Sequence, residues 1–513
     1  MKNIATFLFV YLLSTNIHGQ FSSIQWQKSI GGGMYEFSKE IEYTSDGGTI
    51  NIGYTESSDG DVIFNHGGGD CWIVKLNASG AIDWKKTYGG TGFDYGYSIK
   101  QTPDGGYIAA GYTESHDGDV TINKGGGDCW IIKLDNSGTI IWQKTFGGTL
   151  NDNGQSIALT ADGGYIVTGY TESNNGDVTW NYGAGDCWVL KLDNSGSIQW
   201  QKSLGGSSYD FGQDIKQTSD GGFILSIGSN SNDGDVLTQH GNGDCWIVKL
   251  DNSGSIQWQK SFGGSNYDFG QSIEQTIDGG FILAGYSESN DGDVTAQHGN
   301  GDCWVVKCDK FGNLQWQKAL GSSGNDYAYS IKQIDNGGYV LTGYSGLNDG
   351  DVIGNHGDYD CWVIELDNMG IVRMQKSFGG TGTDIGYSIR QTSPDSYIIA
   401  GYSTSSDGDV IGNHGGGDCW ILRLNVSTLS IADYSQEQTI TVAPNPSSGN
   451  FNFSGLQDES NLVIYDITGK IILQSEVKGI NYSLNLKDEE KGIYFYSVTK
   501  KDGTNKTGKI ILN

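Results

Sequence analysis

Short apolar runs separated by glycine-rich polar turns recur along most of this chain. The run FILAGY is apolar on both faces, which suits a buried strand, and the run LQWQKAL alternates with a period of two, which suits a half-buried one. Asp278-Gly279, just before FILAGY, is a strong β-hairpin signal. The pattern predicts four antiparallel strands in each copy, which we name A, B, C and D. In one copy they cover residues 271–276, 281–286, 303–309 and 314–320.

The whole pattern repeats every 58 residues, and a Cys-Trp dipeptide at the start of strand C marks each of seven copies. A fixed period of this kind is typical of repeat architectures. Four strands in each of seven copies predict an all-β fold, a seven-bladed β-propeller over residues 20–425. A solenoid of stacked sheets would need distinct capping repeats, which the sequence does not show. The dipeptides are Cys71-Trp72, Cys129-Trp130, Cys187-Trp188, Cys245-Trp246, Cys303-Trp304, Cys361-Trp362 and Cys419-Trp420.

The repeat is out of phase with the ends of the array. Residues 24–30 (IQWQKSI) form a strand D ahead of the first complete copy, and the seventh copy stops after its strand C at residues 419–424. We therefore predict that the N-terminal strand completes the last blade. Closing the ring in this way removes the unpaired strand edges that an open array would expose.

Two residue types of the repeat are predicted to lie in the core. Trp occupies one position of strand D in six copies, with Met374 in the seventh, and its alternation with polar neighbours predicts packing between blades. Seven of the eight cysteines share one repeat position, and Cys308 is extra. Because equivalent positions on neighbouring blades are too far apart for a disulfide, we predict buried free thiols.

The order of motifs within one copy resembles a known repeat family. The pattern G-[FY]-I-x-x-G followed by W-x-x-K-L-D-x-x-G-x-I-x-W is similar to the repeats of the PQQ-like propeller superfamily, over residues 24–425. Quinoprotein enzymes of that superfamily carry dedicated quinone and metal ligands, and this sequence offers no such set. The resemblance therefore implies the fold and predicts no catalytic or cofactor-binding residues.

The first 19 residues resemble a signal peptide. Lys2 supplies the positive start, residues 4–13 form an apolar segment, and Ile17-His18-Gly19 precede a plausible cleavage point. The apolar segment is too short to span a membrane, and no later segment reaches the length that a transmembrane helix needs. The sequence predicts an exported protein with no transmembrane segment.

The composition changes after residue 425. Residues 426–440 are polar and unpatterned, which predicts a linker, and residues 441–513 lack Cys and Trp and read as a small β-sandwich of six or seven strands. Their ordered motifs PNPSSGNFNF, IYDITGK, KGIYFYSV and KIIL resemble the C-terminal sorting domain (type A) of type IX secretion substrates. The resemblance implies handling by the type IX machinery, a secreted or outer-membrane surface location and removal of the domain. An ordinary binding sandwich is the alternative.

The net charge of the chain limits the classes of partner that it can bind. Sixty acidic residues against 31 basic ones give a net charge of −29, carried almost wholly by the repeats. Nucleic-acid binding needs a basic surface, so we predict no nucleic-acid partner. The same charge is compatible with cation binding.

The loop between strands B and C carries an Asp-Gly-Asp in six copies and Asn175 with Asp177 in the third. Clustered carboxylates in a glycine-rich loop suit Ca²⁺, which takes oxygen ligands. Asp-Gly is also a turn formula, and Asp caps backbone N–H groups, so a purely structural role is the competing interpretation. The candidate calcium ligands are Asp59, Asp61, Asp117, Asp119, Asp233, Asp235, Asp291, Asp293, Asp349, Asp351, Asp407 and Asp409.

Two further carboxylate positions and one histidine position repeat. The first lies between strands D and A, the second precedes the Cys-Trp dipeptide, and five copies have a His in the B–C loop that is interpreted as a turn or surface residue. The D–A positions are Glu36, Asp94, Asp152, Asp210, Asp268, Asp326 and Asp384. The others are Asp70, Asp128, Asp186, Asp244, Asp302, Asp360 and Asp418. The histidines are His66, His240, His298, His356 and His414.

No nucleophile elbow, zinc signature or phosphate loop appears in the sequence. We therefore predict a non-catalytic binding propeller with a glycan or protein ligand. The alternative is a secreted hydrolase of extracellular polymers that uses carboxylates on the loop face. Catalysis needs one distinct constellation, so a unique site is expected where the copies differ. Such positions include Lys124, His116, Trp180, Tyr182 and Tyr359.

Overall fold

The computed structural model describes residues 20–427, 440–456, 460–499 and 505–513. The expected signal peptide and nearly all of the expected linker lie outside the described residues. The chain divides into two compact units, Met1–Thr428 and Leu429–Asn513, and each is described by itself.

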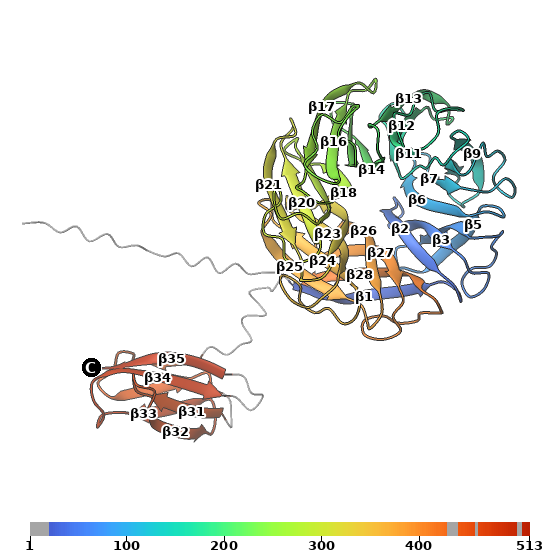
Figure 1. Cartoon of the computed structure of the whole chain (residues 1–513). Helices are drawn as coiled ribbons and strands as arrows, with labels where there is room; N and C mark the ends of the chain where they lie inside the picture. Colours follow the sequence, from blue (N-terminus) through green and yellow to red (C-terminus); the bar gives the residue numbers. More distant parts are fainter. Residues whose placement is uncertain (1–19, 428–439, 457–459, 500–504) are drawn as a thin grey trace, which may run out of the picture. The chain divides into compact units, whose positions relative to one another are not determined.

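The first unit consists of seven four-stranded antiparallel sheets arranged in a ring, which confirms the predicted propeller (Figure 1). The A strands are β2 (Glu36–Tyr43), β6 (Asp94–Gln101), β10 (Ser156–Leu159), β14 (Asp210–Gln217), β18 (Asp268–Gln275), β22 (Tyr327–Gln333) and β26 (Asp384–Ser393). The B strands are β3 (Thr49–Thr55), β7 (Tyr107–Thr113), β11 (Tyr165–Thr171), β15 (Phe223–Ser229), β19 (Phe281–Ser287), β23 (Tyr339–Ser345) and β27 (Ser396–Ser403).

The two outer positions of each blade follow the same order. The C strands are β4 (Asp70–Leu76), β8 (Asp128–Leu134), β12 (Asp186–Leu192), β16 (Asp244–Leu250), β20 (Asp302–Cys308), β24 (Asp360–Leu366) and β28 (Asp418–Ser427). The D strands are β5 (Ile82–Tyr88), β9 (Ile140–Phe146), β13 (Ile198–Leu204), β17 (Ile256–Phe262), β21 (Leu314–Leu320), β25 (Val372–Phe378) and β1 (Gln20–Ile30).

Strand β1 closes the ring. It pairs antiparallel with β28, with Ile30 opposite Cys419, so that β1, β28, β27 and β26 form the seventh sheet (Figure 1). The closing sheet repeats a side-chain contact of the other blades, because Trp420 Nε1 donates to Gln27 Oε1 at 2.9 Å as Trp246 Nε1 donates to Gln259 Oε1 at 2.8 Å. The predicted closure is confirmed, and the strand is longer at its N-terminal end than predicted.

The core lies between blades. Strands B and C are buried along their length, and one cluster joins Cys71 of β4 to Ile99 and Trp130 of the next blade. A Cβ added to Gly96 would lie only 2.7 Å from Cys71 Sγ, so glycine leaves the space that the thiol fills. All eight cysteines are free and buried, as predicted, and burial raises the pKa of thiols such as Cys245, to about 12.

The strand-D tryptophans pack across the same interfaces. Trp258 is partly buried, and its ring centroid lies 5.7 Å from that of Phe281 in the next blade. Trp84 and Tyr107 repeat this contact at 6.0 Å. The predicted position between blades is confirmed.

The B–C loops cover the outermost strands. Ser203 Oγ of β13 donates to the Trp180 carbonyl at 2.5 Å, and Ser29 Oγ of β1 donates to the Ile411 carbonyl at 3.0 Å. A strand at the edge of a sheet otherwise presents unpaired groups to other chains. The loops therefore shield the rim of the propeller.

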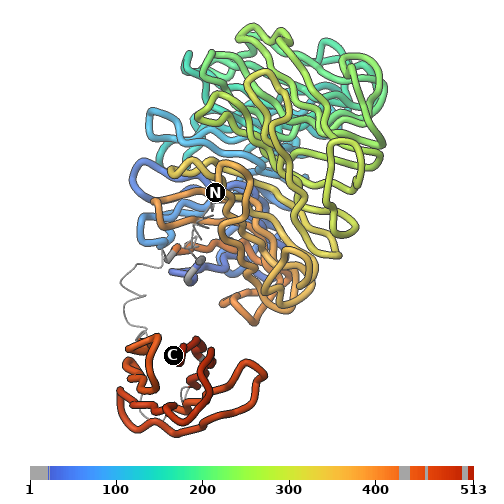
Figure 2. Tube along the Cα trace, turned by 90° about the vertical axis from the view of Figure 1, so that its left-hand side faces the viewer, coloured from blue at the N-terminus to red at the C-terminus, as the bar shows by residue number. Residues whose placement is uncertain are grey.

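The second unit is a sandwich of two sheets, which confirms the predicted architecture, and it is the red part of the trace in Figure 2. One sheet has the order β29-β30-β33 and the other β32-β31-β34-β35, with a shared apolar core. Asn445 binds the last strand, since it accepts from the Ile511 N–H at 2.9 Å and donates to the Lys509 carbonyl at 2.9 Å. The strands are β29 (Thr441–Ala443), β30 (Asn450–Ser454), β31 (Ser460–Tyr465), β32 (Ile471–Val477), β33 (Asn481–Asn485), β34 (Gly492–Thr499) and β35 (Asn505–Leu512).

Candidate functional site

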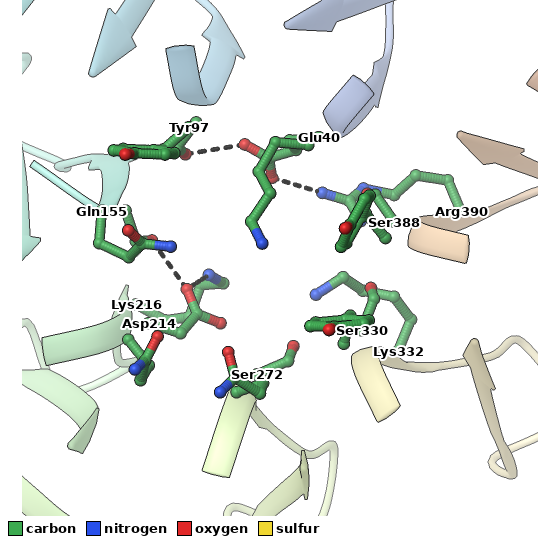
Figure 3. A pocket seen from close by; sticks show the side chains of 17 residues that line it. Glu40, Tyr97, Gln155, Asp214, Lys216, Ser272, Ser330, Lys332, Ser388 and Arg390 are labelled. Carbon is green, nitrogen blue, oxygen red and sulfur yellow. Dashed lines mark hydrogen bonds and ion pairs between the residues drawn. The ribbon is translucent and has the colours of Figure 1, made fainter. Parts of the chain in front are cut away.

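The seven A strands line the axis of the propeller, and a β-bulge interrupts six of them at the same place. In β2 the bulge lies between Ser38 and Glu40 and leaves Lys39 unpaired in the ladder. Bulges redirect side chains, and here the redirected residues reach a cavity of about 80 Å³ on the axis (Figure 3). We call this cavity the channel site.

The first ring of the channel site consists of one residue from each blade: the bulge residue in six blades and Gln155, just before β10, in the other. Their chemistry differs from blade to blade: one lysine, three glutamines and three tyrosines occupy equivalent positions. The ring therefore departs from the seven-fold repetition of the molecule. Its members are Lys39, Tyr97, Gln155, Gln213, Gln271, Tyr329 and Tyr387.

The second ring joins neighbouring blades at the axis. The Ile99 N–H donates to Glu40 Oε2 at 2.8 Å, and the Ile157 N–H donates to Ser98 Oγ at 3.2 Å. The Ile273 N–H donates to an oxygen of Asp214 at 3.1 Å in the same way. These side chains satisfy backbone donors that would otherwise be buried without a partner. The ring consists of Glu40, Ser98, Ser156, Asp214, Ser272, Ser330 and Ser388.

Both carboxylates of the second ring are neutralised. Arg390 donates to Glu40 at 2.8 Å, and Lys216 forms an ion pair with Asp214 (Figure 3). Lys100 also forms an ion pair with Glu40. Burial alone would raise the pKa of Glu40, but the charges of Lys100 and Arg390 outweigh it and hold that pKa well below its usual range. Burial likewise opposes the charge of Lys216 at Asp214, whose pKa is also lowered.

Two other lysines of the channel site have weaker partners or none. Lys39 Nζ lies 4.4 Å from the ring centroid of Tyr387 and 5.0 Å from that of Tyr329, and no ion pair to Lys39 occurs among the residues that the structure describes. Lys332 Nζ lies 3.6 Å from Glu274, at the long end for an ion pair. Burial lowers the pKa of each lysine to about 8.

Aromatic side chains surround the entrance on the face formed by the D–A and B–C loops. Each A strand starts at this face, so residues just before it lie around the channel. Inside the rim, Tyr54 stacks on Tyr95 of the next blade with ring centroids 4.4 Å apart, and Tyr286 stacks on Tyr327 at 3.9 Å. Four residues at the strand starts, each 40 to 50% exposed, are called the mouth aromatics. They are Tyr35, Phe93, Tyr209 and Tyr267.

The aspartates predicted to bind calcium are spread over the blades and contact the D–A loops. The first aspartate of the pair accepts from a loop N–H, as Asp117 does from Thr91 at 2.7 Å. The second accepts a longer bond from a glycine, as Asp119 does from Gly89 at 3.2 Å, or forms an ion pair, as Asp61 does with Lys85 at 2.6 Å. Within the described part of the chain, no three His, Cys, Asp or Glu side chains are grouped as metal ligands.

The other two carboxylate positions meet at each blade junction and are fully buried. Asp94 accepts from Ser115 Oγ at 2.7 Å and from the Gly90 N–H at 2.8 Å. Asp70 Oδ2 is bound by His66, whereas Asp70 Oδ1 has no hydrogen-bond partner. The same oxygen is unpartnered in Asp128, Asp186, Asp244, Asp302, Asp360 and Asp418. We call these seven the junction aspartates.

Burial raises the pKa of the junction aspartates. The pKa of Asp128 rises to about 6 and that of Asp186 to about 7. The blades of these two residues have Lys124 and Tyr182 where the five other blades have histidine. In those five blades the histidine Nδ1 lies 2.6 to 2.8 Å from the aspartate four residues later. The histidines thus cap buried carboxylates, a role more specific than the surface position that the sequence suggested.

The sequence did not single out the channel residues. The repeat-breaking residues it did single out lie elsewhere: Lys124 forms an ion pair with Asp177, and Trp180, Tyr182 and His116 are exposed. Tyr359 contacts Tyr344, with ring centroids 4.9 Å apart. A comparison of the seven A strands with one another would have shown the asymmetry of the channel site.

Comparison with known proteins identifies the second unit. Residues 441–513 match the family model of the secretion system C-terminal sorting domain. This segment is a type IX secretion sorting domain. The sorting domain directs the protein to secretion or cell-surface attachment through the type IX machinery. Among the described residues, no helix is both long enough and apolar enough to cross a membrane.

A relative of the larger part of the chain is the regulatory protein FlaEY of Caulobacter vibrioides, which is 24% identical over 413 residues. The match covers 71% of this chain and 42% of FlaEY, so the chain spans less than half of that protein.

Several solved structures are similar at low identity. BBS1N in complex with ARL6DN is 8% identical, with a TM-score of 0.40, and covers 78% of this chain and 96% of its own. Sqt1 from Chaetomium thermophilum is 11% identical, with a TM-score of 0.39 and coverages of 78% and 100%. Puromycin hydrolase is 11% identical, with a TM-score of 0.42 and coverages of 94% and 60%. Likeness at these scores carries no functional conclusion.

Proposed function

We propose that this protein is a non-catalytic binding propeller of the cell exterior, and that its ligand is a glycan held at the channel entrance. The observation that carries the proposal is the set of four mouth aromatics around a polar, asymmetric channel site. Exposed aromatic rings offer flat apolar faces against which the C–H faces of sugars stack. Polar groups deeper in a site then fix orientation and specificity.

The location of the protein supports this ligand class. The sorting domain sends the chain to the cell exterior, where polysaccharides are abundant. The second ring binds backbone groups of neighbouring blades, so the channel entrance is held rigidly before any ligand arrives. Rigid sites lose less entropy on binding.

The alternative of a secreted hydrolase would need a carboxyl group that keeps its proton near neutral pH to act as general acid. The pKa values of Glu40 and Asp214, the carboxyl groups that line the channel site, are instead lowered by their cationic neighbours. The junction aspartates have raised pKa values but are fully buried, away from a polymeric substrate. Both facts favour binding over hydrolysis.

A glycan array probed with the full chain tests the proposal. We expect Tyr209→Ala and Phe93→Ala each to weaken binding by about tenfold, since each removes a stacking surface. Phe311→Ala is the matched control, because Phe311 is an exposed aromatic in the C–D turn of the opposite face. Binding of proteins without any glycan binding, or release of shortened chains from the bound polymer, would contradict the proposal.

Calcium at the twelve B–C loop aspartates is a separate proposal. It is supported by the acidity of the loops and by the solvent exposure of their first aspartates. Melting of the full chain with Ca²⁺ and with EDTA tests it, with Asp117→Asn in parallel. A stabilisation by Ca²⁺ that Asp117→Asn reduces is the expected result. Equal melting temperatures in Ca²⁺ and EDTA would contradict calcium binding.

A further inference from the structure

The channel site differs in charge from the rest of the molecule. The chain has a net charge of −29, yet four cationic side chains and two carboxylates line the channel site. The cations are Lys39, Lys216, Lys332 and Arg390, and the carboxylates are Glu40 and Asp214. Behind them, Lys100, Glu42 and Glu274 form ion pairs with these groups or with one another. A positive channel inside a strongly acidic protein would attract an anion to this position.

Most of these charges neutralise one another. Arg390 lies 2.8 Å from Glu40 and 3.2 Å from Glu42, and Lys100 pairs with the same two carboxylates. Lys216 pairs with Asp214. Lys332 lies 3.6 Å from Glu274, the same distance as Lys100 from Glu42. Lys39 is therefore the cation of this group that has no ion pair among the described residues.

Lys39 is desolvated without a carboxylate to compensate for it. Two tyrosine rings accompany its ammonium group, at 4.4 and 5.0 Å to their centroids. Such contacts stabilise a cation less than a charge-assisted hydrogen bond does. An anion that enters the channel would restore the missing partner.

Lys332 offers a second positive group from a different blade. Its amine is directed into the same space in Figure 3. The remaining lining includes Gln155, Gln213, Gln271 and several serine hydroxyls, which donate and accept hydrogen bonds without net charge. Two cations beside neutral polar groups fit a ligand that combines one negative charge with hydroxyl groups.

We propose that Lys39 and Lys332 bind the carboxylate of a uronic acid unit, while adjoining sugars of the same glycan stack on the mouth aromatics. This inference rests on the proposed function and deepens it. The cavity of about 80 Å³ holds one small polar group and not a polymer, so the chain of the glycan stays at the entrance. An acidic side chain of a protein ligand would bind the lysines. It would offer no hydroxyl groups to the glutamine amides and no sugar faces to the mouth aromatics.

Isothermal titration of the full chain with tetragalacturonate and with its methyl ester tests this inference. The ester keeps the size and most hydroxyls and removes only the charge. We expect the free acid to bind at least about tenfold more tightly, because a charge-assisted bond is lost in the ester. Lys39→Met and Lys332→Met should each remove most of that difference, and Lys39→Arg should retain it.

Lys310→Met is the matched control, since Lys310 is an exposed lysine in a C–D turn on the opposite face. Its removal changes the net charge equally and should leave the preference intact. Melting temperatures of all variants show whether each is folded. If Lys39→Met does not fold, Lys332→Met provides an independent test.

The outcomes separate this inference from the proposed function. Equal binding of the acid and the ester, abolished by Tyr209→Ala, would overturn the uronate site and leave glycan binding in place. Binding of polyglutamate as tight as that of tetragalacturonate would overturn the assignment to a sugar. Preference for sulfated over carboxylated oligosaccharides would overturn the assignment to a carboxylate. Absence of binding to every glycan would overturn the proposed function itself.

Discussion

The blade junctions and the channel site are built from the same seven repeats but use them in opposite ways. At the junctions, Cys, Trp and two carboxyl groups recur in every blade with nearly constant contacts. In the channel, the redirected residue of strand A is lysine, glutamine or tyrosine, depending on the blade. Repetition therefore accounts for the architecture, and the proposed ligand site lies where the blades differ.

Blade 6 (β22–β25) shows how tightly the architecture is constrained. Five blades place a buried strand-C lysine beside an aspartate of the A–B turn, as Lys249 lies 3.0 Å from Asp220. In blade 6 the lysine is replaced by Glu365 and the aspartate by Asn336, and Glu365 accepts from Tyr397 Oη at 2.8 Å. With Asn336 in place of an aspartate, the buried Glu365 does not face a second carboxyl group, which would be costly. In the channel, by contrast, Lys39 has no ion-pair partner among the described residues.

Removal of the closing strand is the most severe way to break the architecture. Deleting residues 20–30 exposes the edge of β28 and leaves Trp420 without its partner Gln27. We expect the melting temperature to fall by about 10 °C or more, or the protein to aggregate. Circular dichroism against temperature checks this, and an unchanged melting curve would show that β1 is dispensable.

Truncation of the sorting domain should change location completely and leave both regions of the propeller intact. Deleting residues 504–513 removes β35, bares the edge of β34 and leaves Asn445 without its backbone partners. We expect the truncated protein to be retained in the periplasm, which cell fractionation measures. Normal appearance outside the cell would contradict the role of the last strand.

A pair of substitutions sharpens the comparison directly. Trp246→Ala empties a buried position at a junction and should cost about 3–5 kcal/mol of unfolding free energy, with ligand preference unchanged. Gln213→Ala in the channel should alter stability by less than about 0.5 kcal/mol and weaken glycan binding. Denaturant melts and titrations of both variants measure the two effects. If Trp246→Ala changed the glycan preference and left the unfolding free energy unchanged, the assignment of the junctions to stability and of the channel to binding would be wrong.

The smallest effect concerns the pH dependence of a junction. The pKa of Asp186 is about 7 in the folded state and ordinarily 3.8, so the folded state retains a proton that the unfolded state releases. Stability contributed by the protonated group is therefore complete at low pH and is lost as the pH rises from about 4 to about 7.

Asp186→Asn removes this loss, and we expect a melting temperature about 2–4 °C higher at pH 8 and unchanged at pH 4. Asp193→Asn is the control, because hydrogen bonds from Ser197 and Ser195 lower the pKa of that turn carboxylate. It should bring no gain at pH 8. A gain in both variants would indicate a general charge effect in place of the buried proton.

The fold could be predicted from the sequence because the same strand pattern occurs in all seven copies, so an error in reading one copy is corrected by the others. Ring closure was predictable because the sequence alone shows that residues 24–30 form a strand D ahead of the first complete copy. The channel site was not predictable in the same way. Which strand lines the axis, and that a bulge turns Lys39 into it, depends on the packing of all seven blades.

The loop aspartates show the converse difficulty. Residue type and spacing suited both calcium and backbone capping, and only coordinates reveal that Asp117 accepts from the Thr91 N–H. The unpartnered oxygens of the junction aspartates were equally invisible, since burial on all sides arises from two blades at once. Repeated carboxylates in a sequence therefore do not by themselves distinguish ligands from scaffold.

The closing strand has a consequence for assembly from concentrated solutions. Its segment IQWQKS recurs in β13 and β17, so the surface that receives β1 is adapted to a common sequence and not to a unique one. Before closure, β28 of one molecule can accept β1 of another molecule. A reciprocal exchange closes as a dimer, whereas a head-to-tail exchange propagates into filaments. Dilution favours the single ring because the tethered strand then outcompetes free molecules. The yield of monomeric propeller should thus depend on concentration during refolding even where its final stability does not.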